Sequence, residues 1–162
     1  MATNTVRRIA VTEDDRTDDL VEASNYAVAW EVAAAGANRR SAEEWARAIF
    51  EHPPPALRRF VVVGWIWGLG LRLGPRASPD HVLGWAIASR ARDRIILRVH
   101  SVVLGTAHFV LRVETSRIVL ASFVRYEKPW AGAVWWLVKP LHHLIVTYLL
   151  AHAVSHAHFS DE

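Results

Sequence analysis

The side chains that could do chemistry in this sequence are mainly histidines, because the chain contains no cysteine. The absence of cysteine excludes a disulfide framework, thiolate zinc sites and cysteine nucleophiles. His152, His156 and His158 include the His-x-x-x-His spacing, which places two imidazoles on one helix face and could hold a metal. No glutamate lies between them and they are close to the chain end. We therefore predict a solvated terminus and no metal or other cofactor.

His142 has the strongest case for a role in a binding pocket. It follows Pro140, where a long C-terminal helix should kink, and lies at the border of the apolar stripe of that helix. From there it could donate to a ligand or act as an acid–base group, although a structural histidine is the commoner outcome. The sequence contains no Gly-x-Ser-x-Gly elbow, His-Glu-x-x-His pair or phosphate loop, so it identifies no catalytic residue.

The apolar stretch Phe60–Leu71 contains the glycine spacing G-x-x-x-G-x-G, which opens some dinucleotide-binding folds. Trp65 and Trp67 stand between these glycines, where their bulk would block the close approach of a pyrophosphate. The stretch is also shorter than the roughly 20 residues that span a bilayer. It therefore predicts a helix that buries both of its sides, against the core and against a ligand, a partner subunit or a membrane. The alternative, that this helix simply fills a small core, stays equally open.

The longer apolar run, Trp130 to Ala151, carries Lys139, Pro140 and two histidines near its centre. A central lysine costs about 2.5–3.5 kcal/mol on insertion scales, so we predict no transmembrane segment. A peripheral membrane contact stays open, because four arginines flank the tryptophans of the first run. These are Arg58, Arg59, Arg72 and Arg76.

The composition is that of one globular domain. The chain has 162 residues, of which 52% are hydrophobic and 22% charged, enough for a single sizeable core. The net charge of +3 comes from scattered residues, too weak a pattern for nucleic acid binding. Without cysteines or a signal peptide, we predict a cytoplasmic protein. Residues 1–22 lack periodicity and are predicted to be a flexible N-terminal segment before one domain over residues 23–158.

Two helices are predicted after a first strand. Ser24–Ala33 alternates between apolar and polar residues, as strands do. A capping box at Ser41–Glu44 begins a helix that runs to about Glu51, and a second helix follows from about Ala56 to Leu71.

Four strand-like runs follow between residues 81 and 127, and the short breaks between them suit antiparallel hairpins. Alternation places Phe109 and Leu111 on one face, with His108 and Arg112 on the other. We therefore expect an antiparallel sheet with one buried and one solvated face.

A long amphipathic helix is predicted from about Trp130 to His156. At 100° per residue, Lys139, His143 and Thr147 fall opposite a stripe of apolar side chains that should face the core. This stripe consists of Leu137, Leu141, Leu144, Ile145 and Tyr148, and His152 continues it by one turn.

This order of elements resembles the helix-grip fold of the superfamily of START domains, pollen allergens and polyketide cyclases (SRPBCC). Five stretches carry a more specific resemblance: Trp45–Phe50, Ser78–Trp85, Phe123–Pro129, Pro140–His142 and Tyr148–Leu150. They look like an uncharacterised actinobacterial branch of this superfamily, a domain of unknown function. The resemblance covers about Ser24 to Val154 and implies an α+β fold with a curved antiparallel β-sheet wrapped around the C-terminal helix and a cavity between them.

The function predicted from these features is the binding of a hydrophobic small molecule, such as a lipid, sterol-like or polyketide-like compound, in that cavity. Catalysis is less favoured because reactive residues are scarce. Two alternatives stay open: a cyclase- or aromatase-like enzyme that uses a pocket histidine or tyrosine as acid or base, and a homodimeric interaction module. Arg125 is included among the site residues because alternation places it on one face with Phe123, which predicts an inward arginine. The predicted ligand-binding residues are Trp30, Trp65, Trp67, Trp85, Phe109, Arg125, Leu141, His142, Tyr148 and His152.

Overall fold

The computed structural model describes residues 5–16 and 23–160, with side chains described up to residue 157. The strands in this part of the chain are β1 (Val6–Ile9), β2 (Tyr26–Ala33), β3 (Ala77–Ser78), β4 (His81–Val82), β5 (Trp85–Arg90), β6 (Arg94–Ser101), β7 (Gly105–Val113) and β8 (Arg117–Tyr126). The helices are α2 (Ala42–Phe50), α3 (Pro55–Val63) and α4 (Ala131–Ser160), with short helical turns η1 (Glu13–Asp15), η2 (Ala37–Arg39) and η3 (Gly64–Gly68).

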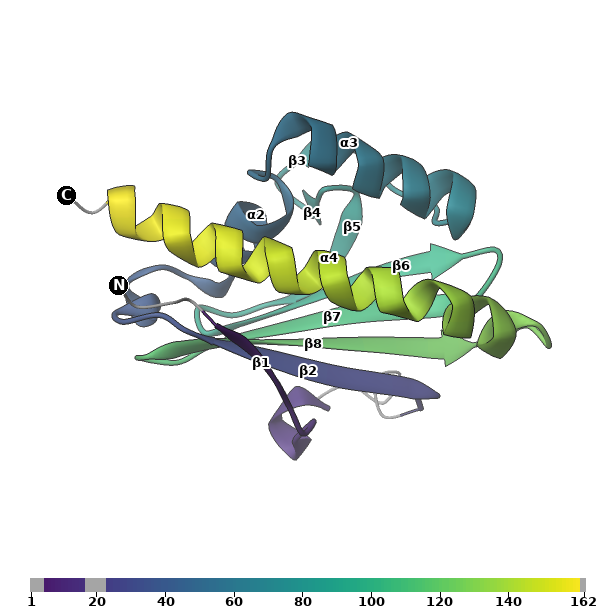
Figure 1. Cartoon of the computed structure of the whole chain (residues 1–162), viewed down its shortest axis with the longest axis horizontal. Helices are drawn as coiled ribbons and strands as arrows, with labels where there is room; N and C mark the ends of the chain where they lie inside the picture. The colour runs from purple at the N-terminus through teal and green to yellow at the C-terminus, as the bar shows by residue number, and fades with distance from the viewer. Residues whose placement is uncertain (1–4, 17–22, 161–162) are drawn as a thin grey trace.

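The strands form one antiparallel sheet in the order β1-β2-β8-β7-β6-β5-β4-β3. Figure 1 shows the long helix α4 lying across one side of this sheet, with α3 alongside it and α2 near one end. A sheet that holds a long C-terminal helix, with two shorter helices inserted after β2, is the helix-grip architecture. The α+β fold class predicted from the sequence is therefore confirmed.

The strands between residues 81 and 126 follow the predicted runs closely. β6, β7 and β8 are consecutive antiparallel partners, joined by short connections at the predicted breaks. β7 begins at Gly105, which has φ of +136°. A Cβ atom on this residue would lie 2.3 Å from the carbonyl oxygen of Arg125, so only glycine fits there.

The predicted capping box starts α2. The Ser41 amide donates to Glu44 Oε2 at 2.6 Å, and the Glu44 amide donates to Ser41 Oγ at 3.2 Å. The second predicted helix is also present, as α3 continued by the wider π-type turn η3. The chain leaves this helical segment at Gly70, which has φ of +61°.

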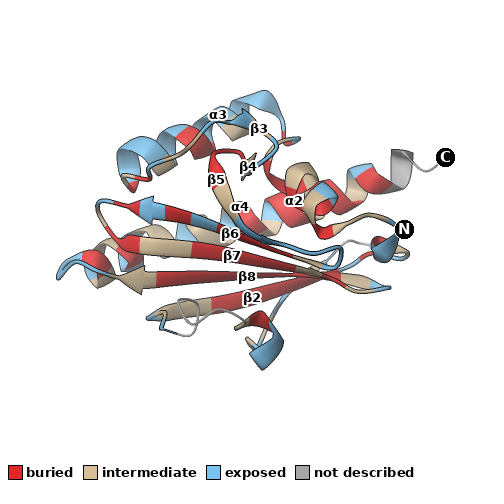
Figure 2. Cartoon of the chain, turned by 180° about the vertical axis from the view of Figure 1, so that it is seen from behind, coloured by how far each residue is buried: buried red, intermediate tan, exposed pale blue. Residues whose placement is uncertain are grey.

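The side of the sheet turned away from α4 differs from the prediction, which expected it to be solvated. His108 on β7 is only 1% exposed, and Figure 2 shows buried residues along β7 and β8 from that side. A cluster of buried apolar residues lies on this side, with Ile9 and Val11 of the N-terminal segment packed against it. The cluster consists of Ala29, Ile96, Val110, Val119, Ala121 and Phe123. The sheet thus has an apolar layer on each side.

The N-terminal segment makes specific contacts with the sheet. The interpretation of residues 1–22 as a flexible segment is wrong for residues 6–9, which pair with β2, and for η1. Asp15 in η1 is fully buried and accepts a hydrogen bond from Arg112 Nε at 2.7 Å. Consequently β2, predicted as the first strand, is the second. Residues 1–4 and 17–22 lie outside the described residues.

A chain of ion pairs joins this segment to three strands. Glu31 on β2 accepts hydrogen bonds from Arg7 on β1 and Arg117 on β8. These hydrogen bonds hold the pKa of Glu31 below the ordinary value, and the bond from Arg7 has the larger effect. Arg117 continues the chain to Glu114, and Glu114 to Arg112. The network therefore connects the edge strand β1 with the centre of the sheet.

α4 meets the length and composition of a membrane-spanning helix over Ala131–Ala157. In this fold it packs on the sheet and closes the core. The predicted buried stripe is wrong in position, since Leu137 and Leu144 are 71% and 68% exposed. α4 is apolar on nearly all sides, so periodicity could not identify the packed one. The side chains of α4 that are buried are Ala131, Trp135, Val146, Leu149, Leu150, Ala153, Val154 and Ala157.

Asp15→Ala tests whether the N-terminal segment stabilises the domain. The substitution removes the buried carboxylate that faces Arg112, so we expect the free energy of unfolding to fall by about 3 kcal/mol. Urea denaturation of both proteins measures this change. The matched control is Asp14→Ala, because Asp14 is exposed in the same turn and its loss should change stability by less than about 0.5 kcal/mol. Equal effects of the two substitutions would contradict the prediction.

Candidate functional site

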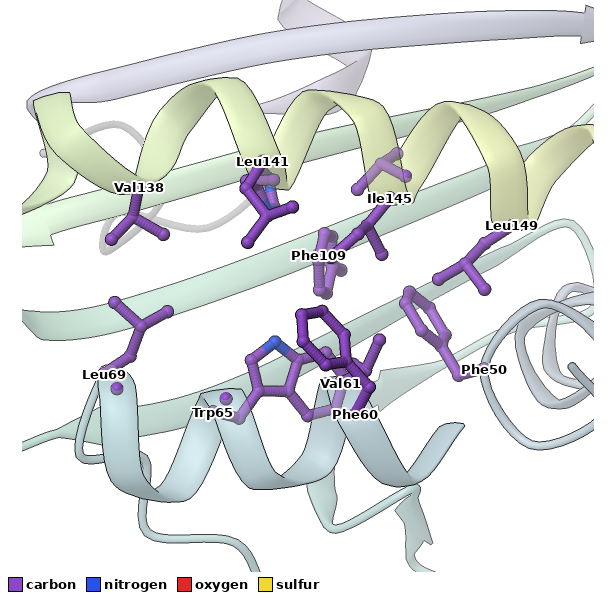
Figure 3. Close-up of a pocket in the computed structure, with 14 residues that line it drawn as sticks. Phe50, Phe60, Val61, Trp65, Leu69, Phe109, Val138, Leu141, Ile145 and Leu149 are labelled. Carbon is purple, nitrogen blue, oxygen red and sulfur yellow. The ribbon is translucent and has the colours of Figure 1, made fainter. Parts of the chain in front are cut away.

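A cavity of about 180 Å³ lies between the α3–η3 segment and α4, on the side of the sheet that α4 covers. Figure 3 shows side chains from both helices converging on it, with Phe109 of β7 and Phe50 from the end of α2 beside them. The residues that line it are Phe50, Phe60, Val61, Gly64, Trp65, Gly68, Leu69, Phe109, Val138, Leu141, His142, Ile145, Val146 and Leu149.

Helical spacing explains how the two helices supply this lining. On the α3–η3 segment, Phe60, Gly64 and Gly68 are four residues apart and share a side. A Cβ atom on either glycine would have nothing within 4 Å, so the two glycines leave open space toward α4. On α4, Val138, His142, Ile145 and Leu149 recur at the three- and four-residue spacing of one helix face.

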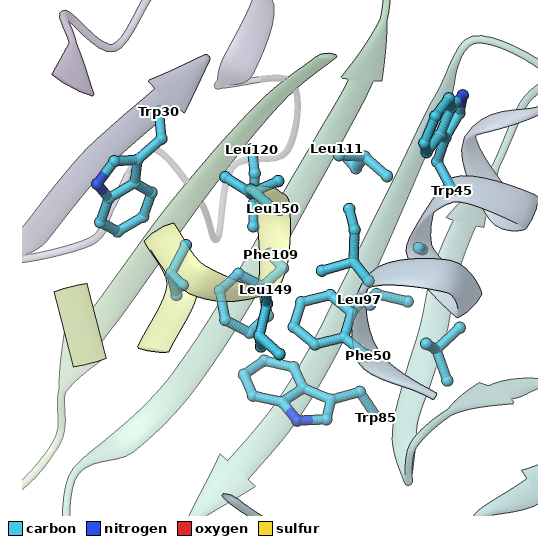
Figure 4. Close-up of a cluster of buried hydrophobic side chains, with 14 of the residues drawn as sticks. Trp30, Trp45, Phe50, Trp85, Leu97, Phe109, Leu111, Leu120, Leu149 and Leu150 are labelled. Carbon is cyan, nitrogen blue, oxygen red and sulfur yellow. The ribbon is translucent and has the colours of Figure 1, made fainter. Parts of the chain in front are cut away.

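An aromatic cluster supports the cavity from the sheet side. Phe109 lies 4.6 Å from Trp85 and 5.1 Å from Phe50, measured between ring centroids. Trp85 in turn contacts Trp65 at 5.5 Å with the rings inclined by 63°. Figure 4 shows Phe50, Trp85 and Phe109 gathered in the core next to α4. Such ring pairs add packing energy beyond their buried area, which stabilises this wall of the cavity.

His142 is the ionisable side chain in the cavity wall. Its ring is stacked on Phe109 at a centroid distance of 6.0 Å and meets Trp135 edge to face at 4.9 Å. A hydrogen bond of 3.1 Å joins its Nε2 atom to Oγ of Ser122, a buried residue of β8. Burial among these groups lowers the pKa of His142 to about 3. The imidazole is therefore neutral at physiological pH.

A second polar pair lies beside His142 but outside the cavity lining. Tyr26 of β2 and His143 share a hydrogen bond between the phenol oxygen and Nε2, and the His143 ring packs edge to face on Trp30 at 5.2 Å. Burial raises the pKa of Tyr26 to about 12, and burial also lowers the pKa of His143. Both groups are therefore uncharged near neutral pH and bind α4 to β2.

The structure brings six of the ten predicted site residues to the cavity or its immediate support. Those in the lining are Trp65, Phe109, Leu141 and His142. Trp30 and Trp85 are buried behind it, Trp30 against His142 at 5.9 Å and Trp85 against Phe109.

The remaining four predicted residues lie elsewhere. Trp67 is 84% exposed on the outside of η3. Tyr148 and His152 stack on each other at 5.8 Å and are absent from the lining. Arg125 does share a face with Phe123, but that face is turned away from α4. The prediction of an inward arginine is wrong, because both sides of β8 are apolar and alternation alone could not tell them apart.

Sequence reasoning missed part of the lining and the partner of His142. Phe60 and Gly64 were recognised only as parts of an apolar helix, although their four-residue spacing marks a common side. Ser122 lies in a strand with few polar residues, which was the available signal for a buried partner. The other lining residues missed were Phe50, Val61, Gly68, Leu69, Val138, Ile145, Val146 and Leu149.

The described part of the chain holds no group of three His, Asp or Glu residues suited to a metal ion. The rings of His152 and His156 are stacked with their centroids 4.0 Å apart. Burial, together with the nearby His156, lowers the pKa of His152.

His142→Gln should flatten the pH dependence of stability. In the unfolded chain His142 takes up a proton near pH 6.5, whereas in the folded chain it stays neutral down to about pH 3. The unfolded state thus binds more protons as the pH falls. The contribution of His142 to the free energy of unfolding is fully present above pH 6.5 and falls below it by about 1.4 kcal/mol per pH unit. When the pH is lowered from 7.5 to 5.0, we expect the free energy of unfolding of the variant to fall by about 2 kcal/mol less than that of the wild type. Urea denaturation at the two pH values measures both changes. Identical losses would contradict this assignment.

The comparisons with known proteins found structural similarity only. No family model matches the chain, and no curated protein matches it. One similar solved structure is the crystal structure of Ara h 8.0201, with 10% sequence identity and a TM-score of 0.41, covering 80% of this chain and 98% of that one. Another is the solution NMR structure of a protein from Arthrobacter aurescens, with 11% identity and a TM-score of 0.44, covering 86% and 90%. The helix-grip assignment rests on the strand order and helix placement of this chain itself.

Proposed function

We propose that this protein binds a slender hydrophobic small molecule with one uncharged polar group in the cavity between α3 and α4. The observation that carries the proposal is the lining itself, which is apolar except for the His142 imidazole and the Trp65 indole N–H. Apolar walls with a few placed polar groups are typical of small-molecule sites. Each methylene that moves from water into such a wall contributes about 0.8 kcal/mol.

The volume of the cavity favours a small ligand, such as a single alkyl chain, over a fused ring system. At about 180 Å³ the cavity is smaller than the roughly 300–1,000 Å³ of sites for drug-sized ligands. It is close to the roughly 150 Å³ of an engineered apolar cavity that accepts benzene. A sterol-like or polyketide-like compound would fit only if α3 moved outward, so a single lipid-like chain is the preferred ligand.

The charge state of the lining favours a neutral polar group on the ligand. Figure 3 shows the indole nitrogen of Trp65 on the ring edge turned toward α4, where the N–H can donate a hydrogen bond. His142 is uncharged, and no arginine or lysine lines the cavity. An ionised carboxylate would therefore lose its hydration without gaining a cation. An alcohol, ketone or ester is the better match.

A cyclase- or aromatase-like activity is less well supported. His142 is the ionisable group in the lining, and a base whose conjugate acid has a pKa of about 3 takes up a proton poorly at neutral pH. Tyr26 and His143 form a hydrogen bond with each other outside the lining.

Membership of the actinobacterial branch and a cytoplasmic location stay predictions from the sequence.

The neutral-ligand proposal predicts that 1-octanol binds at least tenfold more tightly than octanoate at pH 7.5. The two molecules have equal chain length, so they differ mainly in the charge that must be buried. Isothermal titration calorimetry at one temperature measures both affinities. Preference for octanoate, or binding of neither compound, would contradict the proposal.

Gly64→Leu should abolish octanol binding while the protein stays folded. Gly64 has helical backbone angles and open space at its Cβ position, so the new side chain would extend into the cavity without a backbone clash. The matched control is Ala56→Leu, which enlarges an exposed residue of α3 that does not line the cavity. We expect the control to bind octanol within twofold of the wild type, and unchanged binding by Gly64→Leu would place the ligand elsewhere.

A further inference from the structure

The α3–η3 segment and α4 expose large apolar side chains next to the cavity. Trp67 is 84% exposed, a high value for a tryptophan in a folded domain. Clustered exposure of this kind marks an interaction surface. The side chains that form it, here called the α3–α4 apolar face, are Phe60, Val63 and Trp67 with Leu137, Leu141 and Leu144.

The two helices contribute to one continuous face. Phe60 of α3 and Leu141 of α4 line the same cavity, yet they are 55% and 46% exposed. They therefore form the two sides of its opening to the outside. Trp67 follows Phe60 by two turns, and Leu137 and Leu144 lie one turn before and after Leu141.

The charge of these two segments differs from that of the rest of the chain. Residues 53–79 and 128–160 contain four arginines and two lysines but no aspartate or glutamate. The remaining residues hold the other 13 of the 19 basic side chains together with all 16 acidic ones. The two stretches of sequence that carry the apolar face are therefore cationic, whereas the rest of the chain is slightly acidic.

Arginines lie directly beside the apolar side chains of α3. A groove on this helix is lined by Arg58, Arg59 and Arg76 together with Val63 and Ile66, and no acidic residue lines it. Apolar side chains and arginines on one helix match the boundary of a bilayer, where acyl chains lie beneath phosphate groups.

We propose that the α3–α4 apolar face docks on an anionic lipid bilayer, with Trp67 and the leucines among the acyl chains and the arginines on lipid phosphates. A second copy of the chain fits the face less well, because it would bring two sets of cationic side chains together. The docking does not depend on the ligand proposed above. If both hold, the cavity opens toward the membrane and an apolar ligand enters from it.

The experiment is flotation of the purified protein with two kinds of vesicle, one of phosphatidylcholine alone and one in which roughly a third of the lipid is anionic phosphatidylglycerol. We expect binding to the anionic vesicles at least tenfold tighter than to the neutral ones, and weaker binding in high salt.

Two variants and one control locate the contact. Trp67→Ser should weaken binding to anionic vesicles at least fivefold, and Arg59→Glu combined with Arg76→Glu at least tenfold. Trp136→Ser is the matched control. Trp136 is 69% exposed but lies two turns from His143, on the flank of α4 that faces β2, so its loss should leave binding within twofold.

Three results would overturn the docking proposal: no binding to anionic vesicles, equal binding by Trp67→Ser and wild type, or a stable dimer in native mass spectrometry that buries this face. Gly64→Leu separates the two proposals, because it should lose octanol but keep vesicle binding. Loss of vesicle binding by Gly64→Leu with normal folding would show that the docking needs an open cavity, and the independent docking proposed here would be wrong.

Discussion

The geometry of α4 against a single sheet is the constraint on which the rest of this structure depends. The helix is thirty residues long and apolar on nearly every side, but a sheet can bury only one side of a helix. Trp135, Leu149 and Leu150 occupy the packed side. His143 fixes one flank to β2 through Tyr26. The opposite flank lies toward α3, and on the outermost side Leu137 and Leu144 are exposed among the described residues.

The cavity follows from how α3 meets this second flank. Two apolar helices normally fill the space between them with interdigitating side chains. At Gly64 and Gly68 the α3–η3 segment has no side chain to contribute, and open space lies at both Cβ positions. Phe109 and Trp65 line the space but pack on the ring of Trp85 and leave it open. The volume is therefore a consequence of two small residues at helical spacing, held open by aromatic rings that already pack on one another.

The sequence predicted the elements well and their orientation less well, for reasons particular to each. β6 to β8 were predictable because apolar runs of strand length are separated by short breaks. β1 was missed because two of its four residues are arginines. The predictions of the packed side of α4 and of the direction of Arg125 were wrong for one reason. Apolar residues occur on both sides of each element, so no polar side shows which one faces solvent. His142 was found from its place after Pro140, but its partner Ser122 required the strand register.

The two edge strands of the sheet have a consequence for how the protein can associate with other molecules. One edge strand, β3, has two residues, and the other, β1, has four and carries Arg7 and Arg8. Short and charged edges offer few free backbone groups as a template for another strand. The described sheet is thereby protected against edge-to-edge growth into fibrils. Most of the exposed large apolar side chains lie instead on the helical side, where side chains rather than backbone amides would decide the partner.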